Sequence, residues 1–260
     1  MSRVITNQRG PFTADQLQTG DEYELSNGHP IQCSPAGGRH SGSNADGAAI
    51  IGSDPDVDSV GVDAGFSPEP GTLRAPDVAV GVSKEPGWTP GAPPLALEYA
   101  DRGQDEDDLA GKIHDLLRAG TQWIWVIRLD GPHRVEIHTL DGMHLAHPGD
   151  ELTAPGVLRN AVPVEALFDR QAAERVTLRN LLQRQGYADL NAVQAESRDL
   201  GVREGELKAL RSTLLEACEA KDFQLTDDHR KLVHACEDPD RLQTWFRRSI
   251  RVATVNEVFD

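Results

Sequence analysis

The sequence predicts an α/β domain, with a mixed β-sheet and flanking helices, over residues 12–170, followed by an all-α domain over residues 171–260. Before residue 170, short apolar runs alternate with turns rich in Gly, Pro and Asp. Beyond it, apolar residues recur at helical spacing in successive segments. Because side chains alternate every two residues in a strand and repeat every 3.6 in a helix, this change of period indicates two structural units. In this prediction, residues 1–11 form an N-terminal tail.

The first elements after the tail are a predicted hairpin and a weakly patterned segment. The stretch YELSNGHPIQCSPAGG, residues 23–38, contains two short strand-like runs around Asn27-Gly28. Asn-Gly between such runs is a strong signal for a two-residue hairpin turn. Residues 40–73 are rich in Gly and Asp, so we expect helix there over a few residues at most.

The next predicted elements are two strands, a helix and two further strands. The runs PDVAVGV (76–82) and PLALEYA (94–100) are each short enough for a single strand. In DEDDLAGKIHDLLRAG (105–120), an apolar stripe follows an acidic first turn and precedes a glycine, which predicts an amphipathic helix. TQWIWVIRL (121–129) is apolar on both faces, as is typical of a buried central strand, and HRVEIHTL (133–140) alternates like a half-exposed neighbour.

Helical spacing dominates the C-terminal part of the chain. ERVTLRNLLQRQ, EGELKALRSTLLEACEAK, DDHRKLVHACE and PDRLQTWFRRSI all show it. Thr226-Asp227 and Asp238-Pro239 mark two helix starts. Arg247, Arg248 and Arg251 form either a basic patch or a solvated helix face.

The composition is acidic, and the excess of acid is concentrated before residue 170. The net charge is −16: residues 1–170 hold 12 Lys and Arg against 26 Asp and Glu (−14), and residues 171–260 hold 14 against 16 (−2). A protein that binds nucleic acid through phosphates normally has a basic surface, and the composition of this sequence does not indicate one. No apolar run approaches the length of a membrane span, the N-terminus lacks the apolar core of a signal peptide, and the three cysteines are far apart. These features predict a cytoplasmic protein with no membrane partner.

Two of the predicted strands each contain one carboxylate. With a period of two, Asp77 and Glu98 each fall on a face of small residues, opposite bulky Val or Leu side chains. Small neighbours leave room for a metal ion with its waters and for a substrate. Alternatively, Asp77 caps a turn after Pro76, and Glu98 pairs with a basic side chain. Lys112 lies at the border of the apolar stripe on the following helix, where it could reach Glu98 or simply extend from a helix edge into water.

The order of these segments resembles that of the bacterial Uma-type restriction endonuclease family, a branch of the PD-(D/E)xK nuclease superfamily. The resemblance covers about residues 12–168 and rests on the segments GTLRAPDVAV, GAPPLALEYA and GKIHDLLRAGTQWIWVIRLDG in that order. It implies a restriction-endonuclease-like core in which Asp77 and Glu98 bind metal and Lys112 completes the catalytic set. The usual lysine two residues after the glutamate is replaced by Ala100. Glu24 and His40 match further family positions.

The chain departs from the family pattern in two places. After its glutamate the family usually has a Val-x-Ser-Pro loop, where this chain has the acidic stretch EYADRGQDEDD (98–108). After the position of His40 the family has a helix, where this chain is interrupted by Gly and Asp. These differences bear on substrate binding more than on metal binding.

The resemblance implies a hydrolase that cleaves phosphodiester bonds of DNA with Mg²⁺ or Mn²⁺, in defence or mobile-element biology. Two carboxylates would hold the ion through oxygen ligands. Two other functions stay open. One is a degenerate nuclease fold that serves as a binding or regulatory module. The other is an assembly protein in which residues 171–260 form a homo-oligomer or recruit a protein partner.

Overall fold

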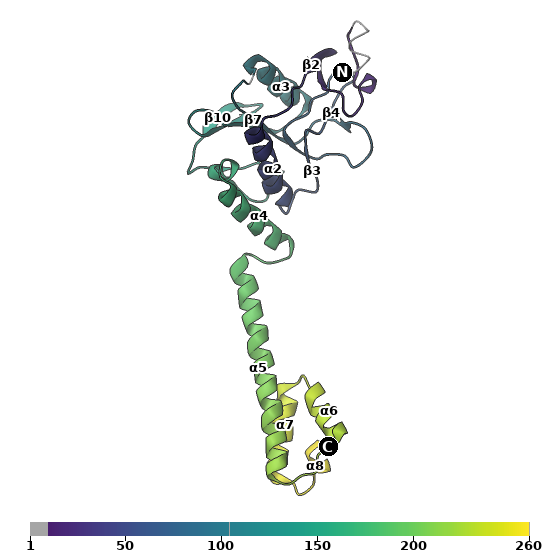
Figure 1. The fold of residues 1–260 in the computed structure, drawn as a ribbon, viewed down its shortest axis with the longest axis vertical. Coiled ribbons are helices and arrows are strands. Elements are labelled where there is room, and N and C mark those ends of the chain that lie inside the picture. Colours follow the sequence, from purple (N-terminus) through teal and green to yellow (C-terminus); the bar gives the residue numbers. More distant parts are fainter. Residues whose placement is uncertain (1–9, 104, 260) are drawn as a thin grey trace. The chain divides into compact units, whose positions relative to one another are not determined.

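The computed structural model describes residues 10–103 and 105–259, and the chain forms two compact units (Figure 1). The first unit comprises Met1–Ala188 and the second comprises Asp189–Asp260. The division therefore falls after Ala188 rather than near residue 170, where the sequence period changes.

Helix α4 (Arg170–Arg184) explains this boundary because it packs against α2 (Gly38–Ser53) of the first unit. Asn180 is buried and donates a hydrogen bond to Ser53 Oγ at 3.2 Å. Arg184 donates to the Ser53 carbonyl at 2.9 Å. The helical period of α4 predicts its secondary structure, but tertiary contacts such as these are what assign it to the first unit.

The main sheet of the first unit has six strands in the order β10-β9-β8-β7-β5-β3. β7 and β8 are parallel and the other neighbouring pairs are antiparallel, so the sheet is mixed, as predicted. Its strands are β3 Val60–Val62, β5 Val78–Val80, β7 Leu95–Ala100, β8 Trp123–Arg128, β9 Arg134–Thr139 and β10 Gly142–Ala146. The smaller elements of this unit are β1 Tyr23–Ser26 with β2 His29–Gln32, β4 Phe66–Ser67 with β6 Thr89–Pro90, β11 Glu151–Leu152 with β12 Val162–Pro163, and the 3-10 helices η1 Ala14–Gln16 and η2 Val164–Leu167.

The two faces of the main sheet are covered by different helices. One face packs against α2 in a core cluster that includes Leu97 and Trp125. The other face packs against α3 (Glu106–Ala119), which meets the small residues Ala96 and Ala100. β7 is buried along its whole length between these two layers.

Helix α2 differs most from what the sequence predicts. The expectation of a few helical residues at most after position 40 is wrong, because α2 runs for 16 residues. A Cβ atom at Gly47 would lie 2.2 Å from Tyr99 Oη, so this glycine lets the helix approach the sheet closely. Packing against the sheet outweighs the low helix propensity of glycine, which is about 1 kcal/mol worse than alanine.

The predicted hairpin and the predicted amphipathic helix are both present. Asn27 (φ 49°) and Gly28 (φ 77°) join β1 to β2 in the left-handed conformation that an Asn-Gly hairpin turn requires. The side chain of Asp105 accepts two backbone N–H groups at the start of α3, and Gly120 (φ 108°) ends the helix.

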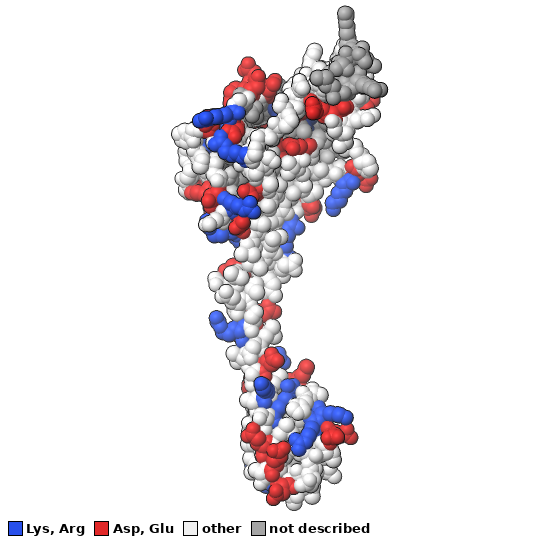
Figure 2. Space-filling model, in the orientation of Figure 1, with Lys and Arg blue, Asp and Glu red and all other residues white. Residues whose placement is uncertain are grey.

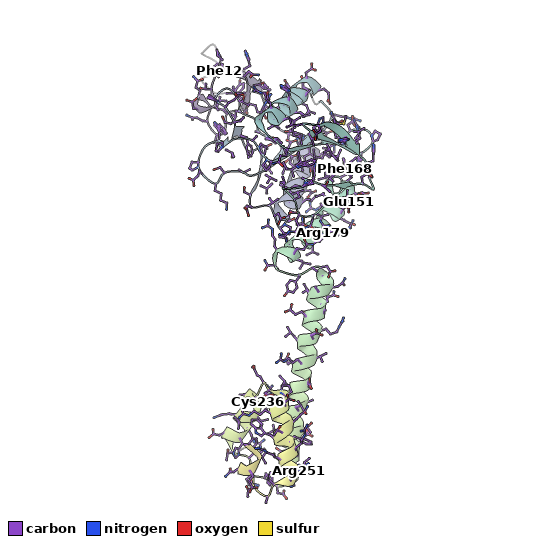
Figure 3. All side chains as sticks on the ribbon, turned by 180° about the vertical axis from the view of Figure 1, so that it is seen from behind. Phe12, Glu151, Phe168, Arg179, Cys236 and Arg251 are labelled. Carbon is purple, nitrogen blue, oxygen red and sulfur yellow. The ribbon has the colours of Figure 1, made fainter. Side chains whose placement is uncertain are left out.

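The second unit is all helical, as predicted for this part of the chain. It consists of α5 Leu190–Ala220, α6 Asp227–Ala235, α7 Pro239–Arg251 and α8 Asn256–Phe259. Thr226 and Asp238 cap α6 and α7. The core of this unit includes Leu214, Trp245 and Cys236, the last of which is labelled in Figure 3. In the part of the chain with described structure, no helix combines the length and the apolar character needed to cross a membrane.

Candidate active site

Glu98 and Lys112 meet where β7 lies against α3. Lys112 Nζ is 3.0 Å from Glu98 Oε1 and 3.1 Å from Glu98 Oε2, and it donates to the Ala75 carbonyl at 2.7 Å. Only 6% of the surface of Glu98 is exposed. The small-residue face of β7 therefore does hold Glu98 beside Lys112. This contact is common to the catalytic interpretation of the pair and to the alternative of a structural ion pair.

Asp77 lies immediately before β5 and makes contacts of a different kind. Its Oδ2 accepts the backbone N–H of Tyr99 at 2.6 Å, beyond the Val78–Leu97 pair at which the β5–β7 ladder ends. Its Oδ1 is 2.9 Å from His40 Nε2 and accepts from Asn44 Nδ2 at 3.3 Å. The Asp77 carboxylate thus replaces a backbone acceptor and also contacts two residues of α2. The alternation of side chains along a strand, which correctly places Glu98 toward α3, therefore does not describe Asp77.

The strand register places Asp77 and Glu98 at the same end of the β5–β7 ladder. Val78 pairs with Leu97 in this antiparallel ladder, and Asp77 and Glu98 each lie one residue beyond that pair. Burial is the main cause of the raised pKa of Glu98, and the charge of Asp77 raises it further. Residues that lie 21 positions apart in the chain thus share one end of the sheet.

A buried series of alternating charges supports Lys112. Glu24, on β1, has Oε1 at 3.1 Å from Lys112 Nζ and Oε2 at 3.1 Å from Arg74 Nη1. Arg74 Nη2 is in turn 2.7 Å from Asp115 Oδ2. The exposed fractions of Glu24, Arg74 and Asp115 are 7%, 2% and 3%. From Asp115 to Lys112 the charges alternate in sign, so each of these buried charges has an opposite neighbour, and Glu98 extends the series when its carboxyl is ionised. We refer to these five residues as the charge series.

Three residues of this site, Arg74, Asp115 and Asn44, were not predicted from the sequence. Arg74 stands in the same R-x-PD segment as Asp77, but nothing in the sequence shows which acids it meets. Asp115 follows Lys112 by three residues on α3, a helical spacing that places the two on neighbouring positions and could have been noticed. Asn44 follows His40 by four residues, but the segment was not expected to be helical, so this spacing carried no signal.

Burial and local charges set the protonation of the site. Burial raises the pKa of the Glu98 carboxyl to about 8, although Lys112 acts in the opposite direction. Burial also disfavours the charged form of Lys112, but Glu24, Glu98 and Asp77 raise its pKa above the usual value. For Asp77, burial is outweighed by the hydrogen bond with His40 and the charge of Lys112, which lower its pKa. The hydrogen bond to Asp77 raises the pKa of His40.

The available donors suit a hard divalent cation. Glu98 Oε1 is buried and has no hydrogen-bond partner, because Lys112 Nζ is close but lies outside hydrogen-bond geometry for this oxygen. Asn44 Oδ1 is likewise buried without a partner. Mg²⁺ is typically bound by one or two carboxylates and keeps several waters. Across the described residues no group of three or more His, Cys, Asp or Glu side chains could hold a metal, so Asp77 and Glu98 would need water or substrate oxygens to complete a coordination shell.

Comparisons with known proteins agree with the fold. A family model described as "Uma2: Putative restriction endonuclease" matches residues 12–165. The structure is similar to one described as a "putative nuclease belonging to DUF820" from Anabaena variabilis ATCC 29413, with 19% sequence identity and a TM-score of 0.54. That match covers 63% of this chain and 99% of the other, and at this identity it concerns the fold alone. A search of the curated proteins gives no match.

Proposed function

This chain belongs to the Uma2 putative restriction endonuclease family, and we propose that it hydrolyses phosphodiester bonds of DNA with the help of a bound Mg²⁺ or Mn²⁺. In this proposal residues 12–170 form the nuclease domain, and Asp77 and Glu98 hold the ion. The observation that carries it is the buried Glu98 carboxylate, which has one oxygen free of hydrogen bonds and lies beside both Lys112 and Asp77.

The side chains of the site have distinct tasks in this proposal. When bound, the ion would lower the pKa of a coordinated water and stabilise negative charge on the scissile phosphate. Asp77 is kept ionised by His40 and Lys112, so one carboxylate is ready to bind a cation at neutral pH. Glu98 has to lose a proton to become the second ligand, because burial raises its pKa to about 8.

In this proposal, Lys112 neutralises negative charge on the substrate. Its ammonium has three N–H donors, and Glu98, Glu24 and the Ala75 carbonyl lie within 3.1 Å of Nζ. To donate to a phosphate oxygen, Lys112 therefore has to exchange one of these acceptors. The Ala75 carbonyl is the one acceptor of the three that carries no charge, so we expect that contact to be exchanged.

Glu98→Gln tests this proposal with little disturbance of packing. The amide keeps the size of the carboxyl, and Lys112 keeps Glu24 and the Ala75 carbonyl as acceptors. We expect loss of cleavage of plasmid and single-stranded DNA, measured with Mg²⁺, Mn²⁺ or EDTA. The rise in melting temperature caused by Mg²⁺ should also be lost, because ligand binding to the folded state is what produces it. Without metal, the variant should melt at the same temperature as the wild type or higher, since an unfavourable buried carboxyl is removed.

Glu136→Gln is the matched control. Glu136 is a carboxylate on β9 of the same sheet, and it accepts from Arg128 Nε at 2.8 Å, two strands away from β7. This variant should keep both cleavage and the Mg²⁺-induced rise. Cleavage that survives in Glu98→Gln at the wild-type rate would remove Glu98 from the mechanism.

A second candidate function is a nuclease fold that binds without cleaving. It is favoured by the acidic segment 98–108 after Glu98 and by the charge series, which neutralises its own members without a metal ion. Wild-type protein that neither cleaves DNA nor melts at a higher temperature with Mg²⁺ or Mn²⁺ would favour this function over hydrolysis.

A further inference from the structure

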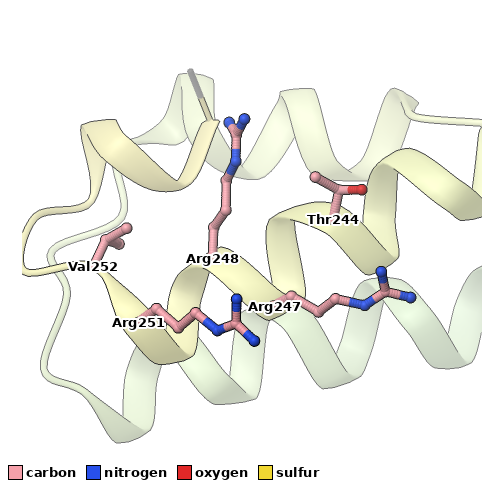
Figure 4. Close-up of a pocket in the computed structure, with 5 residues that line it drawn as sticks. All are labelled: Thr244, Arg247, Arg248, Arg251 and Val252. Atoms are coloured by element: carbon pink, nitrogen blue, oxygen red, sulfur yellow. The ribbon is translucent and has the colours of Figure 1, made fainter.

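Helix α7 presents one apolar face and one basic face. Leu242, Trp245 and Ser249 are buried in the core of the second unit. On the other side Arg247, Arg248 and Arg251 are exposed, and with Thr244 and Val252 they line a pocket of about 310 Å³ (Figure 4). We call Arg247, Arg248 and Arg251 the α7 arginine face.

Within the described part of the chain, the α7 arginine face has no acidic partners of the kind that several exposed arginines of the first unit have. Among the described residues none of its three guanidinium groups lies within 4.0 Å of a carboxylate. Arg247 donates to the neutral Gln243 at 3.3 Å. In the first unit, by contrast, exposed arginines such as Arg102 and Arg118 pair with Asp130 and Glu69.

Capping of the helix end does not account for these three arginines. Cations are favourable near the last carbonyls of a helix, and two of the three lie in the last turn of α7. Lys221, however, already donates to the Ile250 carbonyl at 2.6 Å and to the Val252 carbonyl at 3.4 Å. Among the described residues no carboxylate offsets the mutual repulsion of the three guanidinium groups, and an external anion would remove that cost.

We infer that the α7 arginine face binds the phosphate backbone of DNA. This inference rests on the proposed function, because it takes DNA as the substrate. Residues 1–170 carry a charge of −14, so a polyanionic substrate gains little there from long-range attraction. Figure 2 shows Lys and Arg side chains gathered on the second unit, although acidic side chains lie among them.

The spacing of the α7 arginine face suits a phosphate backbone. Arg251 follows Arg247 by four residues and Arg248 by three, so its Cβ lies about 5–6 Å from each of theirs. The adjacent Arg247 and Arg248 project in different directions (Figure 4). A DNA strand presents one charge roughly every 3.4 Å along the helix axis, and arginine binds phosphate through two parallel hydrogen bonds. The face therefore offers up to three phosphate contacts, which carry no sequence information.

The test is the salt dependence of DNA binding by the full-length triple variant Arg247→Gln, Arg248→Gln and Arg251→Gln. Anisotropy of a labelled duplex is measured with EDTA, so that cleavage cannot interfere, from about 50 to about 200 mM salt. Each lost phosphate contact should reduce the slope of log K against log salt by about 0.9, or about 2.7 for three contacts. A second triple variant with lysines at these positions should keep most of the slope, because it keeps the charges.

The matched control replaces Arg198, Arg203 and Lys208 with glutamine. These residues are exposed on α5 of the same unit, so the change in charge is the same. The control should bind like the wild type. The inference would be overturned by an unchanged slope in the first triple variant or by an equal loss of slope in the control. It would also be overturned if the wild type did not bind DNA, or if polyglutamate at equal charge displaced the DNA. The metal and cleavage results with Glu98→Gln are independent of these measurements, so the two proposals can fail separately.

Discussion

Replacing Arg74 with methionine removes the central cation of the charge series. The guanidinium of Arg74 is 3.1 Å from Glu24 Oε2 and 2.7 Å from Asp115 Oδ2, and only 2% of the residue is exposed. Methionine retains much of the apolar volume of the arginine stem, so few packing contacts are lost. The chief consequence is electrostatic, because two buried carboxylates lose their shared partner.

The expected cost follows from this burial. Removing one partner of a buried ion pair costs about 3–5 kcal/mol, because the remaining charge stays buried without compensation. Of their partners among the described residues, Asp115 keeps the hydrogen bond from Ser26 Oγ and Glu24 keeps Lys112. For a unit of this size, 1 kcal/mol shifts the melting temperature by about 2–4 °C, so we expect a fall of roughly 6–20 °C.

Arg118→Met is the control for this experiment. Arg118 lies on the same helix as Asp115 and pairs with Glu69, but the two side chains are 46% and 50% exposed. An exposed pair contributes about 0–1 kcal/mol, so this variant should melt close to the wild type. Thermal unfolding can be followed by tryptophan fluorescence, to which the buried Trp125 of the first unit contributes. If both variants lose the same small amount of stability, the charge series does not stabilise the fold in the way argued from burial.

Four further predictions concern three positions. Because burial raises the pKa of Glu98 to about 8, Mg²⁺ binding below that pH must release a proton, so calorimetric affinity should rise with pH and level off above about 8. Without metal, that raised pKa should make the wild type lose stability relative to Glu98→Gln as pH rises from the usual carboxyl range toward 8. Gly47→Ala should lower the free energy of unfolding by about 1–3 kcal/mol, and with it the melting temperature, because the added Cβ would lie 2.2 Å from Tyr99 Oη. Adding Tyr99→Phe should restore part of this loss. Asp238→Ala removes the acceptor of two N–H groups at the start of α7 and should cost the second unit about 0.5–2 kcal/mol in thermal unfolding.

The sequence by itself determined the elements whose signals are local. The Asn27-Gly28 turn, the capped and amphipathic α3, and the doubly apolar β8 all form where the pattern predicts them. In each case the residues that specify the element lie within it or next to it. Such signals depend on backbone conformation and on one buried face, which a single segment of sequence displays.

Tertiary packing decided where local signals are weak or misleading. α2 forms despite its glycines because Gly47 is what allows close contact with Tyr99, a residue far along the chain. α4 belongs to the first unit because Asn180 and Arg184 bind to Ser53. A helical period reports that a segment is helical, but it does not report which partner the helix packs against.

The candidate site shows the same division. Its outline from Asp77 to Lys112 follows from the sequence and the family resemblance, since the chain order of the motifs is preserved. The alternating charges of Glu24, Arg74 and Asp115 do not follow from the sequence, because these residues come together only after a hairpin, a loop and a helix have folded. Coulomb energy depends on distance and burial in space, so the protonation of Glu98 and the charge of Lys112 are properties of the folded site rather than of any segment of sequence.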